Sequence, residues 1–361
     1  MLCIASLLCA TVHAKDWPMF RGDAALTGVT TENLPKELSL LWSFKTAGPI
    51  KASPIVADGK VFIGSSDTNV YALNFSDGKK LWSFTTSNAV EAPALFLNGK
   101  VFVGGIDGYL YALAAKDGQL IWKYKTDDKI VGAPNVIPGT PPRLVIGSYD
   151  YKLHCLDVAT GKSNWVYESG YYINGSPAVS DGKTAFGGCD SLLHIISVTD
   201  GKQLHEIEIG ANIGASVALA DNRAYFGHYS SEFLCVDLAK TNIVWRYKNR
   251  DFPYFSSAAV TSDKVLFGGH DKLLHCVRRD DGKEVWRFAT HGKVQSSPVV
   301  ADDKVVVGSD DGRVYVVSLK DGKEIWSYEI GAAIGSSPAV ADGRIVIGSD
   351  DGTVYCFGLK Q

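Results

Sequence analysis

The 361-residue sequence has no basic excess, since 36 Lys and Arg against 39 Asp and Glu give a formal net charge of −3. Nucleic-acid-binding domains normally carry a basic patch, so this balance argues against a nucleic-acid partner. No run of like charges forms a charged tail. No stretch approaches the ~18 apolar residues of a transmembrane helix. With 46% hydrophobic and 21% charged residues, the composition is that of a soluble globular protein with a large core.

The first fourteen residues, "MLCIASLLCATVHA", contain no Asp, Glu, Lys or Arg. A short apolar stretch is followed by the small residues Val12 and Ala14, the pattern that a signal peptidase reads. We therefore expect a signal peptide over residues 1–14 and a periplasmic or otherwise extracytoplasmic protein. A buried N-terminal strand is the alternative, and the missing basic n-region is consistent with a start codon upstream. We expect no outer-membrane lipoprotein anchoring, because Leu8 stands where a small residue should precede Cys9.

What the sequence does contain is a repeat marked by tryptophan. The spacings between successive tryptophans are 40, 40, 43, 80, 41 and 40 residues, for Trp42, Trp82, Trp122, Trp165, Trp245, Trp286 and Trp326. The spacing of 80 spans two repeats, with His205 where a tryptophan would stand. A self-similar period near 40 is typical of propellers and related repeat architectures.

Each period contains four short apolar runs. In "SSPVVADDKVVVGSDDGRVYVVSLKDGKEIW" (residues 296–326) these runs are separated by Asp-Asp, Asp-Gly and Asp-Gly. Asp-Gly between alternating apolar residues is a strong hairpin signal, because both turn positions need a positive φ. Three hairpin turns give four antiparallel strands, A to D, and "IPGTPPR" (residues 137–143) lengthens one A–B turn. Helical periodicity is lacking throughout, so we predict an all-β propeller.

Strand A indicates the number of blades. Small residues dominate just before its proline position: Ala52-Ser53, Glu91-Ala92, Gly132-Ala133, Gly175-Ser176, Ala215-Ser216, Ser256-Ser257, Ser296-Ser297 and Ser336-Ser337. Inner strands converge on the central axis, where only small side chains leave room for their neighbours. Glu91 is the exception. Eight such segments predict eight blades.

The two ends of the repeat array complement each other. The segment "LSLLWSF" (residues 38–44) is a strand D with no strands before it, and the last period ends in "GSDDGTVYCFGLKQ" without a strand D. Pairing the two would remove the exposed sheet edges. We therefore predict an eight-bladed β-propeller of four-stranded antiparallel blades over residues 38–361, with the ring closed by an N-terminal strand that completes the last blade. Residues 15–37 form a lead segment.

The blade pattern resembles that of the PQQ-repeat (pyrroloquinoline-quinone-like) β-propeller family, whose signature is A-x-D-x-x-T-G-K-x-x-W. The copy "LDVATGKSNW" (residues 156–165) is nearest to it, and "NFSDGKKLW", "AAKDGQLIW" and "SLKDGKEIW" are looser. The segment "DWPMFRGDAALTG" (residues 16–28) is similar to the start of secreted bacterial members. The resemblance covers residues from about 38 to 361. It implies that the seven spaced tryptophans dock neighbouring blades.

The resembled superfamily divides into quinoprotein dehydrogenases, which use pyrroloquinoline quinone (PQQ) and calcium, and non-catalytic periplasmic scaffolds such as the outer membrane protein assembly factor BamB. The dehydrogenases have features that this chain lacks: it has no adjacent pair of cysteines and no Cys-x-x-Cys-His haem motif. Among its tryptophans, only Trp17 is free of a docking position. The chain is also shorter than the usual dehydrogenase. We therefore expect no catalytic, cofactor-binding or metal residues, and more readily a non-enzyme than an enzyme.

The repeat accounts for most acidic, cysteine and histidine side chains. Aspartate occupies the B–C turn in seven blades, as in Asp67, Asp107, Asp150, Asp190, Asp271, Asp310-Asp311-Gly312 and Asp350-Asp351-Gly352, so turn geometry explains it before calcium does. Four cysteines share one blade position and cannot form disulfides with each other: Cys155, Cys235, Cys276 and Cys356. Three histidines, His154, His194 and His275, replace the tyrosine of other blades (Tyr71, Tyr111, Tyr315 and Tyr355) and are not predicted to form a metal triad.

The departures from the repeat cluster in blades four to six, in "ESGYYINGSP", "FGHYSSEF" and "YKNRDFPYFSSAA". The D–A connections of a propeller emerge on one face, so these segments predict a partner surface. It consists of Tyr171, Tyr172, Asn174, His228, Tyr229, Arg250, Phe252, Tyr254 and Phe255. The alternative is that these aromatic residues plug the funnel or pack between blades, with Tyr254 in the apolar position of Ile213 and Ile334. We expect Lys51 and Glu91, on adjacent blades, to pair.

Three hypotheses for function follow. The leading one is an exported, non-catalytic propeller scaffold that mediates protein–protein interaction, BamB-like and possibly in outer-membrane protein assembly, with the β-barrel assembly machinery as a possible partner. The second is a short quinoprotein dehydrogenase of alcohols or sugars, the only hypothesis that needs PQQ and calcium. The third is a propeller that binds a glycan or small ligand in its funnel. We expect a monomer without a transmembrane segment.

Overall fold

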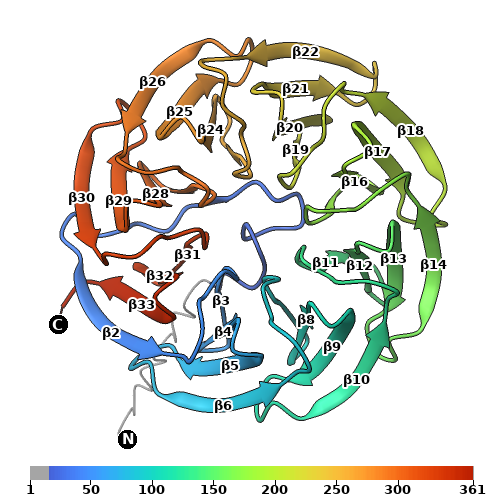
Figure 1. Cartoon of the computed structure of the whole chain (residues 1–361), viewed down its shortest axis with the longest axis horizontal. Coiled ribbons are helices and arrows are strands. Elements are labelled where there is room, and N and C mark those ends of the chain that lie inside the picture. Colours follow the sequence, from blue (N-terminus) through green and yellow to red (C-terminus); the bar gives the residue numbers. More distant parts are fainter. Residues whose placement is uncertain (1–15, 361) are drawn as a thin grey trace, which may run out of the picture.

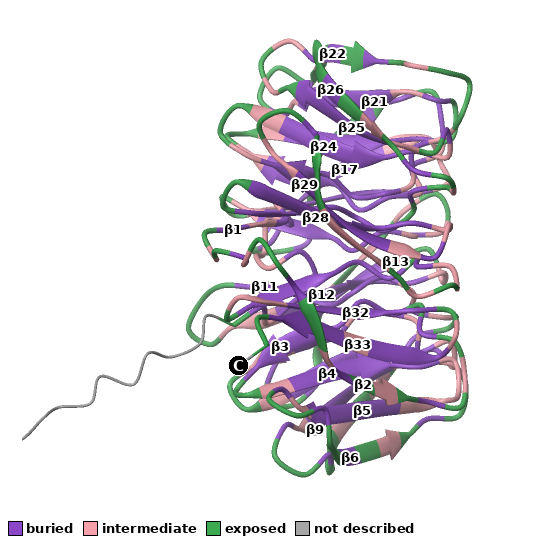
Figure 2. Ribbon diagram, turned by 90° about the vertical axis from the view of Figure 1, so that its left-hand side faces the viewer, coloured by how far each residue is buried: buried purple, intermediate pink, exposed green. Residues whose placement is uncertain are grey.

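The computed structural model describes residues 16–360, which form 33 β-strands in eight sheets arranged as a ring of blades (Figure 1). The predicted signal peptide, residues 1–14, lies outside the described residues. No helix in residues 16–360 has the length and apolar character required to span a membrane. Edge-on, the ring is a disk whose buried strands lie inside and whose connections are exposed (Figure 2). The predicted eight-bladed propeller is confirmed.

Seven blades consist of four consecutive antiparallel strands, and the eighth is completed by an N-terminal strand. In chain order, with strand A first, the first four blades are β3 (Ile55–Ala57), β4 (Lys60–Gly64), β5 (Asn69–Asn74) and β6 (Lys80–Thr85); β7 (Leu95–Leu97), β8 (Lys100–Gly104), β9 (Tyr109–Ala114) and β10 (Leu120–Lys125); β11 (Asn135–Ile137), β12 (Arg143–Gly147), β13 (Lys152–Asp157) and β14 (Ser163–Glu168); β15 (Ala178–Ser180), β16 (Lys183–Gly187), β17 (Leu192–Ser197) and β18 (Gln203–Glu208). The last four are β19 (Ala218–Ala220), β20 (Arg223–Gly227), β21 (Phe233–Asp237) and β22 (Asn242–Tyr247); β23 (Ala259–Val260), β24 (Lys264–Gly268), β25 (Leu273–Arg278) and β26 (Glu284–Ala289); β27 (Val299–Ala301), β28 (Lys304–Gly308), β29 (Arg313–Ser318) and β30 (Glu324–Glu329); β31 (Ala339–Ala341), β32 (Arg344–Gly348), β33 (Thr353–Gly358) and β2 (Ser39–Lys45). A short strand, β1 (Val29–Thr30), adds in parallel to β27.

The burial of each strand follows its place in the blade. Strands B and C, such as β4 and β5, are buried on both faces because neighbouring blades cover them, and they read as nearly continuous apolar runs. Strand D, such as β6, lies at the outer edge and has mostly exposed residues. The A–B turns hold Asp58 and Gly59 at φ of 52° and 68°, the positive values that Asp-Gly predicts.

The ring closes between strands from opposite ends of the sequence. Strand β2 pairs antiparallel with β33, with Ser39 opposite Gly358 and Lys45 opposite Thr353. The indole N–H of Trp326 in blade seven donates a hydrogen bond to the carbonyl of Leu38, at 2.9 Å. The predicted closure is therefore confirmed, and β2 lies beside β33 in Figure 1.

In residues 16–360, tryptophans on strand D bridge seven of the eight blades to the next blade. The Trp82 indole donates to the carbonyl of Ala115 at 3.0 Å, and its ring lies so close to Gly118 that a Cβ there would be 2.6 Å from it. The same indole-to-carbonyl bond is made, in the described chain, by Trp42, Trp122, Trp165, Trp245, Trp286 and Trp326. The glycine of the C–D turn is therefore required by the tryptophan of the preceding blade.

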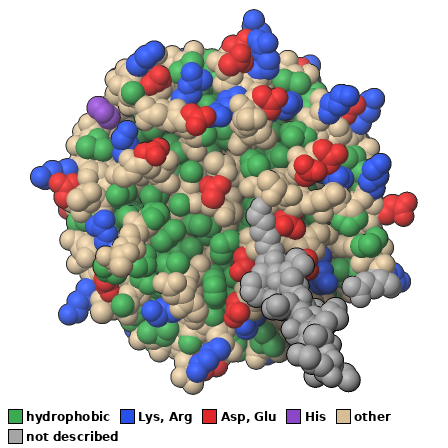
Figure 3. Space-filling view, turned by 180° about the vertical axis from the view of Figure 1, so that it is seen from behind, with side chains coloured by type: hydrophobic (Ala, Val, Ile, Leu, Met, Phe, Trp, Pro, Cys, Tyr) green, Lys and Arg blue, Asp and Glu red, His purple; other side chains and the backbone are tan. Residues whose placement is uncertain are grey.

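The lead segment runs along the inner edges of the blades. Backbone carbonyls from Trp17 to Gly28 accept hydrogen bonds from strand-A N–H groups of six blades: Val56, Phe96, Val179, Leu219, Val260 and Val300. The Asn135 side chain of blade three donates to the carbonyl of Ala24, at 2.7 Å. Strand A is the inner edge of each sheet, so the lead segment satisfies N–H groups that would otherwise be unpaired. Seen from behind, hydrophobic side chains gather around the middle of the disk and charged ones around its edge (Figure 3).

Arg21 fixes the lead segment at the axis. Arg21 is 1% exposed, and its guanidinium donates to the carbonyls of Ala258, Ser297 and Pro298, at 2.9, 3.1 and 2.6 Å. Burial lowers the pKa of Arg21 to about 9, against the opposing effect of Asp23. The backbone carbonyl dipoles of blades six and seven stabilise the positive charge of the Arg21 guanidinium.

Candidate functional site: the central funnel

The candidate site is the funnel on the axis of the ring, whose lower wall is a ring of serines. The Ser297 N–H donates to Ser337 Oγ at 3.0 Å, and the Ser337 N–H donates to Ser53 Oγ at 3.0 Å. Equivalent bonds run through Ser176, Ser216 and Ser257. The sequence explained these small residues by lack of space, and the structure adds that their hydroxyls link the strands A of neighbouring blades.

The lead segment closes one end of the funnel, and two adjoining cavities remain at the other. The inner one, ≈ 200 Å³, has Phe20 of the lead segment among its lining residues. The outer one, ≈ 420 Å³, is lined by Lys51, Phe255, Gln295, Asp310, Ala333, Gly335 and Asp350. Four residues line both cavities: Lys51, Phe255, Gln295 and Gly335. The funnel is thus a blind pocket of the size that small ligands or single side chains occupy.

The funnel is lined at two repeat positions whose residue differs from blade to blade. The wall position, just before the serine ring, holds Lys51, Glu91, Val131, Asn174, Gly214, Phe255, Gln295 and Gly335. The rim position, in the B–C turn, holds Ser66, Ile106, Tyr149, Cys189, Tyr229, His270, Asp310 and Asp350. In every blade of the described chain, the rim N–H donates to a carbonyl two residues before the wall position of the preceding D–A connection, as Asp310 does to Lys293. The fold fixes these positions and leaves their side chains free to vary.

Blades seven, eight, one and two form the charged half of the funnel. Lys51 Nζ and Glu91 Oε1 lie 3.2 Å apart, which confirms the predicted pair. The Gln295 amide donates to Asp310 Oδ2 at 2.9 Å. Burial raises the pKa of Asp350, and the charge of Asp310 adds to this effect while Lys51 opposes it. Carboxylates therefore outnumber the cations on this side.

Blades three to six form an aromatic half. Tyr149 stacks on Tyr172 with ring centroids 4.7 Å apart, and Tyr172 contacts Tyr171 and Tyr151 at 4.5 and 5.0 Å. Nearer the axis, Phe255 contacts Tyr229 at 4.5 Å and His270 at 4.6 Å. We call these seven residues the aromatic arc: Tyr149, Tyr151, Tyr171, Tyr172, Tyr229, Phe255 and His270.

The structure divides the predicted partner surface. Tyr171, Tyr229 and Phe252 are 42%, 51% and 45% exposed, and Arg250 is also exposed. Tyr172, Asn174 and Phe255 are half-buried in or beside the funnel, where the Asn174 amide lies 3.0 Å from Cys189 Sγ.

Two residues of that predicted surface are buried. Tyr254 is 0% exposed, because it packs against Phe267 and His275 in the apolar position that Ile213 and Ile334 occupy elsewhere. His228 is 2% exposed, because it replaces a turn serine and its Nδ1 accepts from the Ser230 N–H. Neither side chain is exposed to a partner.

The turn aspartates and their histidine or tyrosine neighbours form hydrogen bonds within each blade. Asp311 accepts from the Tyr315 hydroxyl at 2.8 Å, and Asp271 lies 3.1 Å from His275 Nε2. The second ring nitrogen of His275 lies 3.0 Å from the hydroxyl of Tyr247, which comes from the preceding blade. The same arrangement holds His154 and His194. These groups therefore support turns and blade contacts. The four strand cysteines are buried free thiols.

Several funnel residues were missed by the sequence reasoning: Phe20, Tyr149, Tyr151, His270 and Gln295. The signal that would have found most of them is the variation between blades at a fixed repeat position. Phe20 lies in the lead segment, outside the repeat, and no pattern marks it as part of the funnel.

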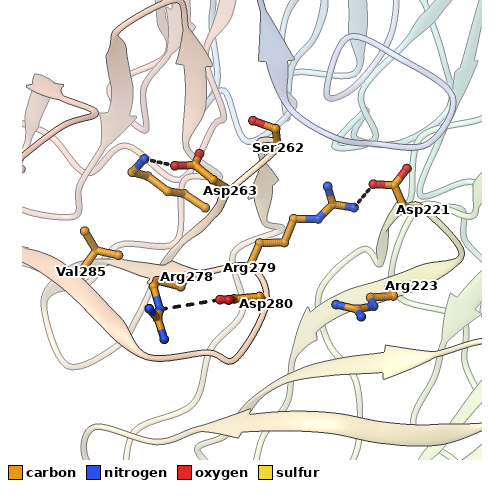
Figure 4. Close-up of a pocket in the computed structure, with 9 residues that line it drawn as sticks. Asp221, Arg223, Ser262, Asp263, Arg278, Arg279, Asp280 and Val285 are labelled. Carbon is orange, nitrogen blue, oxygen red and sulfur yellow. Dashed lines mark hydrogen bonds and ion pairs between the residues drawn. The ribbon is translucent and has the colours of Figure 1, made fainter.

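A third cavity, ≈ 660 Å³, lies outside the funnel, between blades five and six (Figure 4). Its charges largely compensate one another: Arg279 pairs with Asp221 at 2.7 Å, and Lys264 pairs with Asp263 at 2.5 Å. Arg279 also donates to the Tyr225 hydroxyl at 2.9 Å, from a position that is apolar in other blades. This arrangement links two blades.

The residues of the funnel do not fit the quinone-and-calcium arrangement of the resembled dehydrogenases. Seven tryptophans in the described chain dock blades, and the eighth, Trp17, is 3% exposed and packs against Gly22 in the lead segment. In residues 16–360 no three His, Cys, Asp or Glu side chains come together as a metal site.

Two family models match the sequence. One, described as "Beta-alanine-activating enzyme, beta-propeller", matches residues 76–359, and one described as "Outer membrane protein assembly factor BamB" matches residues 37–95. No curated protein matches the sequence.

Solved structures with the same fold include BamB from Moraxella catarrhalis (17% identity, TM-score 0.76, 90% of this chain and 100% of that chain). The quinohemoprotein alcohol dehydrogenase from Comamonas testosteroni aligns at 15% identity (TM-score 0.81, 96% and 81%). The computationally designed Ika8 protein aligns at 17% identity (TM-score 0.79, 89% and 99%). Identities this low show the shared propeller fold and leave the function open.

Proposed function

Because this chain belongs to the β-propeller family described for the β-alanine-activating enzyme, within the PQQ-like propellers, we propose that it is a non-catalytic propeller that binds a protein partner. The partner surface is the funnel face, with the aromatic arc and the exposed Phe252 and Arg250. The role is BamB-like in kind, that of a scaffold in the cell envelope.

The observation that carries the proposal is the gathering of exposed aromatic side chains on one face. Tyr151, Tyr171, Tyr229 and Phe252 are each 39–51% exposed. Tyrosine, tryptophan and arginine dominate the energetics of protein interfaces, since rigid aromatic side chains bury large areas at low entropic cost. Exposed apolar patches of this kind mark interaction sites on soluble proteins.

The proposal includes no cofactor and no metal, and no chemistry at the funnel. This is supported by the poor fit of the funnel residues to quinone and calcium. It also places the protein outside the cytoplasm, on the signal-peptide pattern of residues 1–14.

Co-purification from envelope extracts tests the proposal. The bait is the mature protein without residues 1–14, and the altered bait carries Tyr171→Ala and Phe252→Ala. The matched control carries Leu120→Ala and Ile121→Ala, two residues that are 44% and 43% exposed on the outer strand β10. We expect one partner to be enriched by the wild type and the control, and its enrichment to fall at least tenfold with the altered bait.

Two results would contradict the proposal. One is the absence of any partner that distinguishes the altered bait from the control. The other is turnover of alcohols or sugars, followed by dye reduction, after reconstitution with pyrroloquinoline quinone and calcium, which would favour a dehydrogenase.

A further inference from the structure

The outer cavity of the funnel combines carboxylates with an aromatic wall. Asp310 and Asp350 come from adjacent blades, seven and eight. Both line the cavity of ≈ 420 Å³, and so does Phe255. The lead segment blocks passage through the ring, so a group that enters from the mouth stops inside. Such a pocket suits one compact polar head group or one long side chain.

Asp310 and Asp350 are not required by the turns in which they lie. The structural role in those turns belongs to the following residues, Asp311 and Asp351, which accept from the hydroxyls of Tyr315 and Tyr355. Other blades hold Ser66, Ile106, Tyr149, Cys189, Tyr229 or His270 at the same rim position and form the same turn. The carboxylates of Asp310 and Asp350 are thus not needed for the fold of their blades.

The carboxylates of the cavity are under-compensated. Lys51 is the cation in its lining, and it pairs with Glu91 at 3.2 Å. Asp310 accepts from the neutral amide of Gln295. In the described part of the chain, the Asp350 carboxylate accepts no hydrogen bond and forms no ion pair, and Asp350 is an exposed residue where it lines the cavity. Lys293, the other nearby cation, is exposed on the D–A connection and does not line the cavity.

The aromatic lining of the cavity also favours a cation. Phe255 lines both cavities, and Tyr229 and His270 contact its ring. Aromatic faces attract ammonium and guanidinium groups, and the attraction grows when the cation is partly desolvated. An anion would meet a carboxylate excess, and a neutral ligand would gain no charge attraction from either carboxylate.

We propose that the funnel binds an organic cation, an alkylammonium or guanidinium group, between the carboxylates of Asp310 and Asp350 and the ring of Phe255. The group is carried either by a free amine or by a lysine or arginine side chain of a polypeptide. In the second case the site is part of the proposed partner surface, and the inference rests on the proposed function. The basic side chain of the partner then enters the funnel, and the partner residues next to it cover the aromatic arc.

Calorimetry on the purified mature protein at low ionic strength tests the site without any partner. The probes are agmatine, as a free guanidinium and amine, and N-acetyl-arginine amide, as the side chain in a peptide context. N-acetyl-citrulline amide is the neutral control of nearly the same shape. We expect saturable binding of at least one cation, at least tenfold weaker binding of citrulline amide, and loss of binding as salt is raised.

Matched variants locate the binding. Asp310→Asn with Asp350→Asn should weaken cation binding at least tenfold, and Phe255→Ala should weaken it about threefold to tenfold. Glu208→Gln, an exposed charge change on the outer strand β18, should leave affinity within twofold. Melting temperatures are compared for all variants, and Phe255→Leu replaces Phe255→Ala if the alanine variant melts early.

The proposal is overturned if neither cation binds saturably, if citrulline amide binds as tightly as arginine amide, or if the aspartate variant binds as the wild type does. Preference for agmatine assigns the site to a free amine, and preference for arginine amide to a side chain. Failure of the co-purification experiment leaves these calorimetric results unaffected, so the two proposals can fail separately.

Discussion

Single glycines carry the contact between blades, because the tryptophan of one blade lies flat against the C–D turn of the next. Gly118, at φ +74°, shows this: a Cβ would be 2.6 Å from the ring of Trp82. Gly99 in the same blade has nearly the same backbone, at φ +70°, and a Cβ there would have no atom within 4 Å. A substitution at Gly99 therefore reports backbone strain alone, whereas a substitution at Gly118 reports backbone strain together with a steric clash.

Gly118→Ala should therefore destabilise the protein more than Gly99→Ala. Both substitutions impose a left-handed conformation on alanine, which costs about 1–2 kcal/mol. Only Gly118→Ala also displaces a docked indole, which costs about 1–3 kcal/mol more. Denaturant unfolding of the two variants measures the difference, and equal losses would show that the tryptophan contact does not limit this position.

A second residue-scale feature is the buried pair of Asp271 and His275, whose side chains are both fully buried. Burial by itself would raise the pKa of Asp271. The hydrogen bonds from His275 and from Asn249 outweigh burial and lower that pKa below its ordinary value. A folded-state pKa below the unfolded one stabilises the protein above the unfolded pKa, and this contribution is lost as pH falls through the folded pKa.

Asp271→Asn should thus cost about 1–3 kcal/mol near neutral pH, the range for an impaired buried hydrogen bond. The difference from the wild type should shrink as pH falls below about 4, the unfolded pKa of aspartate. Asp342→Asn, in an exposed turn, is the control and should show no such trend. Urea unfolding from pH 3 to 7 is the measurement, and a difference independent of pH would refute the argument.

At the scale of the blade, the junction between blades four and five departs from the others at two positions. His205 replaces the docking tryptophan of strand β18 and is exposed. The glycine that would face it is Thr241, which keeps the left-handed φ of 53°. Where no ring approaches the turn, a side chain can stand there, so the two departures belong together.

Restoring both residues should restore the contact. His205→Trp alone should not stabilise, because the Thr241 side chain occupies the space of the ring. When it is combined with Thr241→Gly, the free energy of unfolding should exceed the value expected from adding the two single effects by about 1–2 kcal/mol. This coupling energy is within the range measured for residues in contact. A double-mutant cycle in denaturant measures this coupling, and strict additivity would show that the two positions do not meet.

At the scale of the whole molecule, the closure by β2 and the lead segment join the two ends of the repeat array. Deleting residues 36–44 would expose the outer edge of β33 and remove the carbonyl of Leu38 that Trp326 binds. The melting temperature should fall sharply, by about 10 °C or more for a loss of several kcal/mol. An unchanged melt would refute the closure.

A circular permutant provides the control. Its chain begins at Thr46, and residues 16–45 follow Lys360 through a flexible linker, so that the lead segment stays joined to β2 and β2 still pairs with β33. This variant keeps every blade contact and should melt within a few degrees of the wild type. A fall as large as that of the deletion would show that the position of the strand in the sequence matters more than its pairing.

Much of this architecture could be predicted from local patterns. Asp-Gly pairs determine the turns, the tryptophan spacing gives the blade count, and the missing last strand indicates closure, because each depends on chemistry within one repeat or on the repeat's own period. The predicted Lys51–Glu91 pair also depends on one step around the ring. The burial of Tyr254 and His228 was harder to predict, since it depends on which position of a D–A connection or turn faces the neighbouring blade.

The sequence by itself determined the propeller, its eight blades and its closure, because hairpin turns and repeat length are encoded locally. Only the tertiary structure decided that the lead segment lines the inner edges, that Arg21 is buried among carbonyls at the axis, and that Phe20 forms the floor of a blind funnel. Several of those contacts join residues more than 200 positions apart, as between Arg21 and Ser297. They arise only once eight inner strands converge and leave their N–H groups and carbonyls to be satisfied by a segment outside the repeat.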